Sequence, residues 1–253
     1  KLLCVHAEDQ RILDKGKINY RNEKDYVVHN LARPQKAEIE AVRYVLKLSE
    51  EYRVPLHICH VTTKDGVESI KRAKQDGLDI TAETCPHYLV LKILDLMEFG
   101  PYAKMNPPLR TERDNDALWE SLRDGTIDMI VSDHAPHTRE EKDKGLKNIW
   151  FAPSGVPGVE TTLQLILDAV HERRLSLGML VKLMHDNPVA RFSLGRYGYV
   201  EEGNNANLTL VDLKQEWEIT DDKLLTKCGW SIYDGWKGKG DSVGVVINGK
   251  IIL

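Results

Sequence analysis

Three short stretches of the sequence place a histidine or an aspartate directly behind an apolar run. They are LLCVHAED at residues 2–9, LHICHVTT at 56–63 and VSDHAPHT at 131–138. In each stretch a β-prone run leads to His6, His60 or Asp133 and then to a loop. Neutral imidazole and carboxylate suit catalytic Zn²⁺, whose open coordination position holds water. The pattern therefore predicts that these three residues bind one catalytic metal ion if their strand ends meet.

Structural roles compete with this hypothesis. A lone histidine behind a strand is more often a hydrogen-bonded structural residue, and an aspartate there often caps the next helix. Three such residues at corresponding strand ends make the metal site as good a hypothesis as those roles. Glu8 and Asp9 either orient the His6 imidazole or simply begin a loop. We expect His57 to be packed or at an edge, and His134 to make a structural hydrogen bond. Structural or solvated positions are expected for the histidines in loops or on helical faces, His29, His171 and His185.

The elements that must position these residues alternate along the chain. Candidate strands lie in LLCVH, VPLHICH, LDITAET and IDMIVSD. The helical patterns between them cover residues 36–52, 64–77 and 113–125, and residues 10–34 are predicted to form a polar loop. Strands that alternate with helices of this length form βαβ units and a parallel sheet. The sequence therefore predicts an α/β protein.

Polar or titratable residues follow each candidate strand, which is typical of the carboxyl-terminal face of a (β/α)8 TIM-type barrel. A doubly wound sheet also fits the alternation. However, no GxGxxG or GxxxxGK[ST] follows any strand, so a nucleotide-binding version lacks its main support. The stretch REEKDKGLKN at 139–148 has mixed charge and is predicted to be a solvated loop near the site.

The pattern and composition of the sequence change near Gly195. Helical patterns cover 158–174, 176–186 and 187–194, and short strand candidates with glycine and asparagine follow them. VINGKIIL at 246–253 holds an Asn-Gly pair between apolar residues, which is the strongest hairpin signal in the chain. We therefore divide the chain into a barrel segment, residues 1–195, and a small β-sandwich segment, residues 196–253.

Composition limits the function classes. The 253 residues carry a net charge of -4, which gives no basic surface for nucleic acid or an anionic membrane. The apolar runs are far shorter than the ~20 residues of a membrane span. The four cysteines have no CxxC spacing, and most lie in apolar runs. They are expected to be buried free thiols in a reducing compartment, so the predicted location is cytoplasmic.

An ordered set of motifs resembles the dihydroorotase family, in the cyclic amidohydrolase group of the amidohydrolase superfamily. The motifs are VHAED, HICHVTT, TAETCPHYL, KMNPPLR, SDHAPHT, APSGVPGVET and DNPVARF. The resemblance implies a TIM-type barrel, of which this chain supplies roughly strands 5–8, and part of a small β-sandwich. It also implies a zinc enzyme with two ions per complete active site. The implied reaction is the reversible hydrolysis of dihydroorotate to N-carbamoyl-L-aspartate in pyrimidine biosynthesis.

The resemblance also implies residue roles. His6 and His60 match the histidines that bind the second zinc ion. Asp133 matches the aspartate that touches the metal centre and serves as general acid and base. Asn106 and His137 match contacts to the substrate ring and its carboxylate. The backbone near Ser154 and Gly155 matches a further contact to the substrate ring.

The chain departs from the family pattern at its start. The HxH motif behind the first strand, the arginine just past it and the bridging lysine or aspartate behind the fourth strand are absent from this sequence. We therefore expect a longer enzyme whose amino-terminal part lies outside this sequence. Two alternatives stay open: allantoinase or another cyclic amidase, and a catalytically silent scaffold for aspartate transcarbamoylase. The expected partners are a small-molecule substrate, further copies of the chain in a homo-oligomer and, for the scaffold, that transcarbamoylase.

Overall fold

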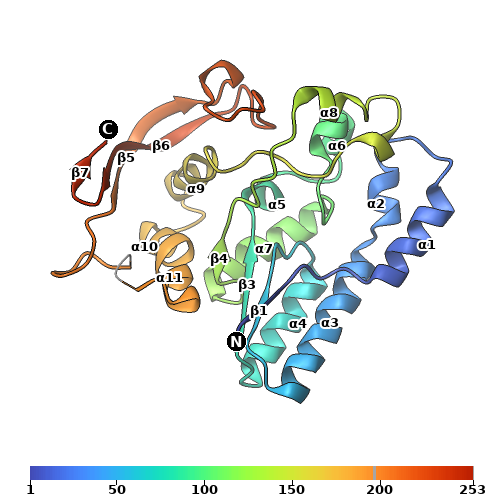
Figure 1. The fold of residues 1–253 in the computed structure, drawn as a ribbon, viewed down its shortest axis with the longest axis horizontal. Helices are drawn as coiled ribbons and strands as arrows, with labels where there is room; N and C mark the ends of the chain where they lie inside the picture. Colours follow the sequence, from blue (N-terminus) through green and yellow to red (C-terminus); the bar gives the residue numbers. More distant parts are fainter. Residues whose placement is uncertain (196–197, 253) are drawn as a thin grey trace.

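A parallel sheet forms the centre of the molecule. The computed structural model describes residues 1–195 and 198–252. Four strands pair in chain order, as Figure 1 shows: β1 (Leu3–Val5), β2 (Leu56–Ile58), β3 (Ile80–Thr84) and β4 (Met129–Ile130). Every pairing among them is parallel, and Leu3 is opposite Leu56, which is opposite Ile80. The predicted strands and their parallel arrangement are confirmed.

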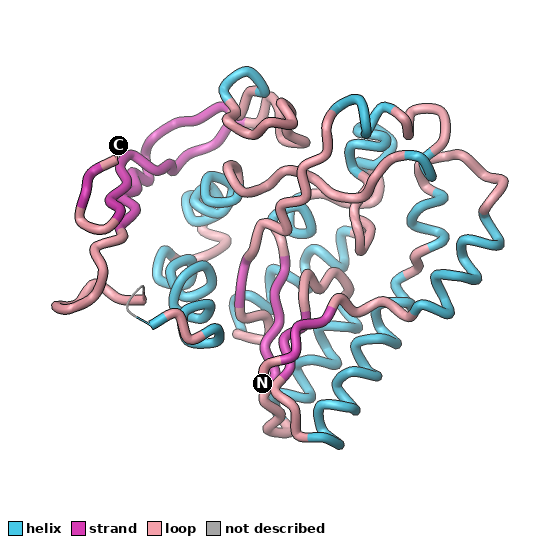
Figure 2. The backbone as a smooth tube through the Cα atoms, viewed as in Figure 1, coloured by secondary structure: helices cyan, strands magenta, loops and turns pink. Residues whose placement is uncertain are grey.

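One long helix precedes each of the strands β2, β3 and β4. The three helices are α3 (Gln35–Tyr52), α4 (Lys64–Gln75) and α7 (Glu112–Asp124). Helices α3 and α4 run side by side along the sheet (Figure 2). Each buries an apolar stripe at helical spacing, such as Val42 and Leu46 on α3 and Val67 and Ile70 on α4. The long helices thus pack against the sheet in one hydrophobic core.

Local capping explains where the helices begin and end. The Thr63 side chain accepts a hydrogen bond from the Gly66 amide at the start of α4. Thr111 and Asp114 form a capping box at the start of α7. Gly125 ends α7 in a left-handed conformation, as its place after the helical pattern predicts.

The loop predicted over residues 10–34 is wrong. Helix α1 (Gln10–Tyr20) and the short helix α2 (Val28–Ala32) occupy most of it. The side chain of Asp9 caps α1 by accepting hydrogen bonds from the amides of Arg11 and Ile12. Gly16 lets the two helices cross closely, because a Cβ there would lie 2.2 Å from the Ala32 carbonyl oxygen. The apolar residues of this stretch are too sparse to give a clear helical period.

Short helices fill the loops beyond the strand ends. Behind β3 lie α5 (Pro86–Val90), α6 (Asp95–Phe99) and the 3-10 turn η1 (Gly100–Ala103). Behind β4 lie α8 (Arg139–Asp143) and the 3-10 turn η2 (Ile149–Phe151). The solvated loop predicted for 139–148 is therefore wrong in part, because α8 is helical and Lys142 has an exposed fraction of 0%.

Helices lead into a second, smaller sheet. They are α9 (Thr162–His171), α10 (Leu177–Val181), the π-helical segment η3 (Lys182–Asp186) and α11 (Asn187–Phe192). The antiparallel strands β5 (Leu208–Glu218), β6 (Lys237–Ile247) and β7 (Lys250–Ile251) follow, with the 3-10 turn η5 (Asp221–Lys223) between the first two. Strand β6 contacts α9 (Figure 1). The predicted hairpin at Asn248 and Gly249 is confirmed, whereas the predicted boundary at residue 196 lies outside the described residues.

Two further sequence expectations have outcomes. All four cysteines are free, but the expectation that they are buried holds only for Cys85. Cys4 is exposed because it lies on β1, an edge strand of the sheet. Within residues 1–195 and 198–252, no helix is long and apolar enough to cross a bilayer.

Candidate active site

The first candidate metal ligands lie just past strand ends. His6 directly follows β1, His60 lies two residues past β2, and Asp133 lies three residues past β4. His60 and Asp133 both have left-handed backbones, with φ of 37° and 42°. Such values are uncommon outside glycine and persist where the surrounding structure determines them. Both strand ends therefore turn sharply where their titratable side chains begin.

The imidazoles of His6 and His60 meet directly. Nδ1 of His6 lies 3.0 Å from Nε2 of His60, and the ring centroids are 4.7 Å apart. The other ring nitrogen of His6, Nε2, donates to the carboxylate of Glu8 at 2.9 Å. A proton held on Nε2 leaves the lone pair of Nδ1 directed at His60. The site therefore presents two neighbouring ring nitrogens of the kind that bind metal ions, and a carboxylate orients the ring that carries one of them.

Glu8 is itself held in place. Arg33 forms an ion pair with the same carboxylate oxygen, and the Glu8 side chain is fully buried. Burial alone would raise the pKa of Glu8, but the hydrogen bond from His6 and the charge of Arg33 outweigh it and lower the pKa below its usual value. Of the two roles considered for Glu8, the structure favours orienting His6. Asp9 instead caps α1.

His60 stays neutral in this environment. Burial lowers its pKa, the neighbouring His6 adds to the effect, and the charge of Asp133 opposes it. The neutral imidazole is the form that binds metal ions. Among the described residues, the buried Nδ1 atom of His60 has no hydrogen-bond partner.

Asp133 lies beside a histidine that the sequence analysis did not single out. Ligand atoms of Asp133, Cys85 and His87 all lie within 4.8 Å of one another. Burial lowers the pKa of His87 to about 3, and its Nε2 atom has no partner within the described part of the chain. The available signal was its position in TCPHYL, directly behind the strand β3. The structure thus adds an unpaired, neutral imidazole to the surroundings of Asp133.

The candidate substrate contacts lie on three neighbouring loops. Nε2 of His137 donates to the Ser154 carbonyl at 3.2 Å. The Gly155 amide donates to the Lys104 carbonyl at 2.9 Å, two residues before Asn106. The buried Oδ1 atom of Asn106 has no hydrogen-bond partner among the residues described. These loops bring the four predicted contact residues into one connected region.

Close packing requires glycine in that region. Gly155 has φ of 136°, and a Cβ there would lie 2.5 Å from the Cβ of Ala135.

His134 accepts hydrogen bonds at Nδ1 from the amides of Gly158 and Val159, at 3.1 and 3.2 Å. This bond confirms the structural role predicted for His134. The residue fixes the loop behind β4 against the segment that carries Gly155.

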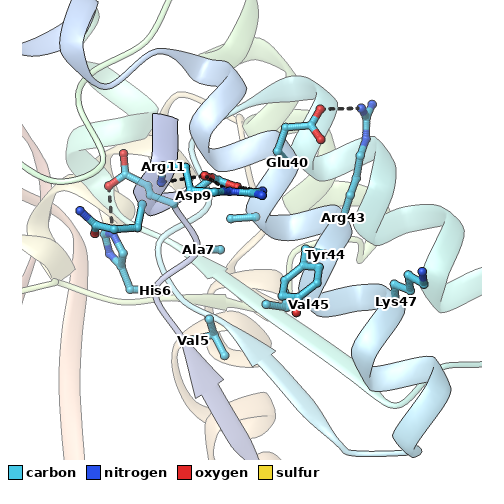
Figure 3. A pocket seen from close by; sticks show the side chains of 13 residues that line it. Val5, His6, Ala7, Asp9, Arg11, Glu40, Arg43, Tyr44, Val45 and Lys47 are labelled. Carbon is cyan, nitrogen blue, oxygen red and sulfur yellow. Dashed lines mark hydrogen bonds and ion pairs between the residues drawn. The ribbon is translucent and has the colours of Figure 1, made fainter. Parts of the chain in front are cut away.

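A large cavity near the start of the chain shares His6 and Glu8 with the candidate metal site. It has a volume of about 660 Å³ and lies between the segment behind β1 and helix α3 (Figure 3). Its walls include Tyr44, Lys47 and an ion pair between Glu40 and Arg43. His6 is the one candidate ligand that lines it. His60 and Asp133 do not line the cavity, so it does not bring the three candidate ligands together.

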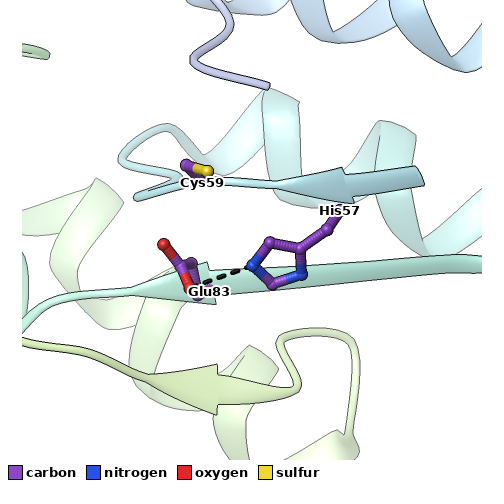
Figure 4. A group of neighbouring side chains, drawn as sticks. All are labelled: His57, Cys59 and Glu83. Atoms are coloured by element: carbon purple, nitrogen blue, oxygen red, sulfur yellow. Dashed lines mark hydrogen bonds and ion pairs between the residues drawn. The ribbon is translucent and has the colours of Figure 1, made fainter. Parts of the chain in front are cut away.

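A second group of metal-ligand types is satisfied without an ion. His57, Cys59 and Glu83 lie together on β2, its following loop and β3 (Figure 4). His57 is buried, and its ring nitrogens pair with the Thr81 hydroxyl at 2.8 Å and the Glu83 carboxylate at 2.9 Å. Its packed position confirms the prediction for this histidine. Burial and the nearby Glu83 raise the pKa of the Cys59 thiol to about 12, which disfavours the thiolate.

Comparison with known proteins gives the family. The sequence matches the amidohydrolase family over residues 3–252. The chain belongs to the amidohydrolase family. Among curated relatives, this amidohydrolase is 36% identical over 252 residues to a dihydroorotase of Pyrococcus furiosus, covering 100% of the chain and 54% of the relative. It is 38% identical over 251 residues to a dihydroorotase of Bacillus cereus, covering 98% and 57%. The chain thus spans about half the length of the curated relatives it matches.

Solved structures agree on the fold. This amidohydrolase superposes on an L-hydantoinase from Arthrobacter aurescens with a TM-score of 0.96 at 32% identity, covering 100% of the chain and 57% of the hydantoinase. A D-hydantoinase gives a TM-score of 0.96 at 33% identity, with the same coverage. The α/β fold predicted from the sequence is confirmed: the whole chain, with its parallel sheet and its small antiparallel sheet, matches part of these TIM-type barrel structures. Its sequence is dihydroorotase-like, at 36% and 38% identity to the two curated relatives.

Proposed function

We propose that this amidohydrolase is a zinc-dependent dihydroorotase, which interconverts dihydroorotate and N-carbamoyl-L-aspartate. The observation that carries the proposal is the 3.0 Å approach of His6 Nδ1 to His60 Nε2 at two adjacent strand ends. Asp133 lies at a third strand end, where its carboxylate groups with Cys85 and His87. The similarity to curated dihydroorotases, 36% over the whole chain in one case, supports this substrate class.

The donor set fits zinc. Two zinc–nitrogen bonds of about 2.0–2.1 Å can span the separation of the His6 and His60 nitrogens. Both imidazoles offer a nitrogen in the neutral form, and Glu8 orients the first through its second nitrogen. His6, His60 and Asp133 would therefore hold the metal, with further ligands supplied from beyond these residues. When bound, zinc supplies Lewis-acid polarisation of the scissile carbonyl and makes water more acidic.

Asp133 is the proposed proton carrier. Its carboxylate would accept the proton of the attacking water and deliver it to the ring nitrogen that leaves. The exposed position of Asp133 lets substrate reach the carboxylate.

Substrate binding falls to the connected loops. The unpaired carbonyl oxygen of the Asn106 side chain would accept a hydrogen bond from a ring N–H of the substrate. The His137 N–H that binds the Ser154 carbonyl would turn to the substrate carboxylate, and the backbone near Ser154 and Gly155 would contact the ring. A site built to hydrogen-bond these groups rejects analogues that lack them, because its buried polar atoms would remain unpaired.

Another cyclic amide is the second candidate substrate. The observation in its favour is the match to hydantoinase structures, with a TM-score of 0.96 at 32% identity. Hydantoins and allantoin lack the ring carboxylate that His137 would bind. A preference for either compound over dihydroorotate therefore separates the two candidates.

The test uses the full-length protein loaded with zinc. We expect hydrolysis of dihydroorotate with kcat/KM at least about 10-fold above the values for hydantoin and allantoin, as expected when one buried polar contact is lost. A preference for hydantoin or allantoin would reject the substrate assignment. A protein that binds zinc at His6 and His60 but hydrolyses none of the three compounds would favour the silent scaffold.

A further inference from the structure

Two buried lysines stand out next to the candidate substrate loops. Lys142 is 0% exposed and Lys104 is 6% exposed. Within residues 1–195 and 198–252, no carboxylate forms an ion pair with either of them. Lysine is rarely buried unless it is paired, because removing its charge from water is costly. The free-energy cost of burying these two lysines suggests that their hydrogen bonds have a structural role.

The ammonium groups bind backbone carbonyls of one segment. Nζ of Lys104 donates to the carbonyls of Ile149 and Ala152, at 2.8 and 2.6 Å. Nζ of Lys142 donates to the carbonyls of Pro153 and Lys104, both at 3.1 Å. Lysine has three donors in a compact head group, so each of the two residues can bind two carbonyls at once. The two lysines thus fasten residues 149–153 to Lys104.

The same segment continues into the proposed substrate contacts. Beyond Pro153, the Ser154 carbonyl accepts from His137 and the Gly155 amide donates to the Lys104 carbonyl. The Val156 carbonyl accepts from the Ala135 amide at 3.0 Å. The 149–156 segment therefore lies between two loops, each of which it meets through backbone hydrogen bonds.

Trp230 joins Lys142 to His137. Its indole Nε1 donates to the His137 carbonyl at 2.7 Å, and its ring centroid lies 5.7 Å from Nζ of Lys142. An ammonium at this distance from an indole ring is attracted by the π-system. Trp230 is fully buried and comes from the segment between β5 and β6. The second sheet thus also braces the loop behind β4.

We propose that Lys104 and Lys142 are positioning residues that fix the 149–156 segment, and through it the backbone of Ser154 and Gly155, for binding the substrate ring. The inference rests on the proposed function for the identity of the bound ring. Neither lysine touches the reacting atoms. Loosening the segment would weaken ring contacts that are equal in the ground and transition states, so it would raise KM more than it lowers kcat.

The test compares Lys142→Met with the matched control Lys74→Met. Methionine keeps the volume of the buried stem and removes the donors. Lys74 also donates to a carbonyl, that of Gly125 at 3.3 Å, but it does so beside Asp128, at the opposite end of β4 from Asp133. In the full-length zinc-loaded protein we measure zinc content, KM and kcat for dihydroorotate, and amide hydrogen exchange of residues 149–156.

For Lys142→Met we expect KM to rise about 10-fold, kcat to stay within about 3-fold and zinc content to be unchanged, on the scale of one lost buried hydrogen-bond partner. Exchange of the 149–156 amides should accelerate at least about 10-fold. Lys74→Met should alter neither the KM for dihydroorotate nor the exchange of the 149–156 amides. Unchanged exchange in Lys142→Met would overturn the proposal, and so would faster exchange with an unchanged KM.

Two further arms keep the outcome interpretable. If Lys142→Met does not fold, Lys142→Gln retains one donor amide and should give a smaller change of the same pattern. The exchange measurement needs no substrate, so it tests the fastening even if dihydroorotate is not hydrolysed. In that case the KM arm is run with the cyclic amide that is hydrolysed, and the proposed function alone has failed.

Discussion

Nδ1 of His6 lies 3.0 Å from Nε2 of His60, although 54 residues separate the two histidines along the chain. Parallel pairing of β1 with β2 brings the two strand ends to the same edge of the sheet. The left-handed turn at His60 and the carboxylate of Glu8 then orient the rings. The proposal of a shared metal ion rests on this relationship.

Substitution of His60 should weaken zinc binding. We expect His60→Ala in the full-length protein to lose zinc affinity by at least about 10-fold, because one of the metal's few nitrogen ligands is gone. His134→Ala is the matched control, since its imidazole accepts backbone hydrogen bonds and should leave zinc content unchanged. Equal zinc content in the two variants would contradict the ligand assignment.

Glu8 and Asp9 are neighbours with different predicted effects. Glu8→Gln should weaken zinc binding by about 10- to 100-fold, because the carboxylate orients His6. Asp9→Ala should leave zinc affinity unchanged and lower the free energy of unfolding by about 1 kcal/mol, as expected for a lost helix cap. Metal titration and denaturant unfolding of both variants check this division. Identical zinc affinities would reject the role given to Glu8.

Asn106 should act through binding. In the full-length protein, Asn106→Ala is expected to raise KM for dihydroorotate by about 5- to 150-fold, the equivalent of losing a hydrogen-bond partner worth about 1–3 kcal/mol. Zinc content should stay at the wild-type level, since Asn106 is not a proposed ligand. Steady-state kinetics with parallel metal analysis provide the test. An unchanged KM would show that the unpaired Oδ1 atom does not meet the substrate.

The buried lysines predict a pH effect on stability. Burial lowers the pKa of Lys142 to about 7 and that of Lys104 to about 8, from 10.5 in the unfolded chain. Between these values the unfolded state binds more protons, so the free energy of unfolding rises with pH from about 7 towards 10.5. The slope is at most about 1.4 kcal/mol per pH unit for each lysine.

The matched comparison is Lys142→Met. Its free energy of unfolding, measured in denaturant at pH 7 and pH 9.5, should rise less over this interval than that of the unsubstituted protein. Equal increases in the two proteins would mean that Lys142 does not lose its proton in the folded state within this range.

The strand ends were predictable from the sequence because each has a local signature. An apolar β-prone run followed by a titratable residue marks His6, His60 and Asp133 without reference to distant parts of the chain. Parallel pairing then follows from the alternation of strands and helices. The Asn-Gly pair likewise fixes its hairpin through local backbone preference, and both residues have positive φ in the structure.

The missed features depend on contacts that are distant in sequence. Lys142 lies in a charged stretch that resembles a solvated surface, and its burial is explained by carbonyls of residues 104 and 153. Helix α1 was missed because its buried residues, Leu13 and Gly16, are few and one is a glycine. His87 stands in TCPHYL just past β3, but its burial depends on packing that the sequence alone does not show.

His137 and Asp133 should show different defects. His137→Ala is expected to act mainly through KM, because its contact with the substrate carboxylate is largely the same in the ground and transition states. Zinc-loaded full-length protein and dihydroorotate provide the comparison. A fall in kcat alone would assign His137 to the chemical step instead.

The most direct measurement of the central claim is kcat for dihydroorotate in the Asp133→Ala variant of the full-length protein at saturating zinc. Loss of a general acid and base should lower kcat by at least about 100-fold relative to the unsubstituted protein. Near-normal turnover in the variant would contradict the catalytic role given to Asp133 and, with it, the hydrolytic site built on these strand ends.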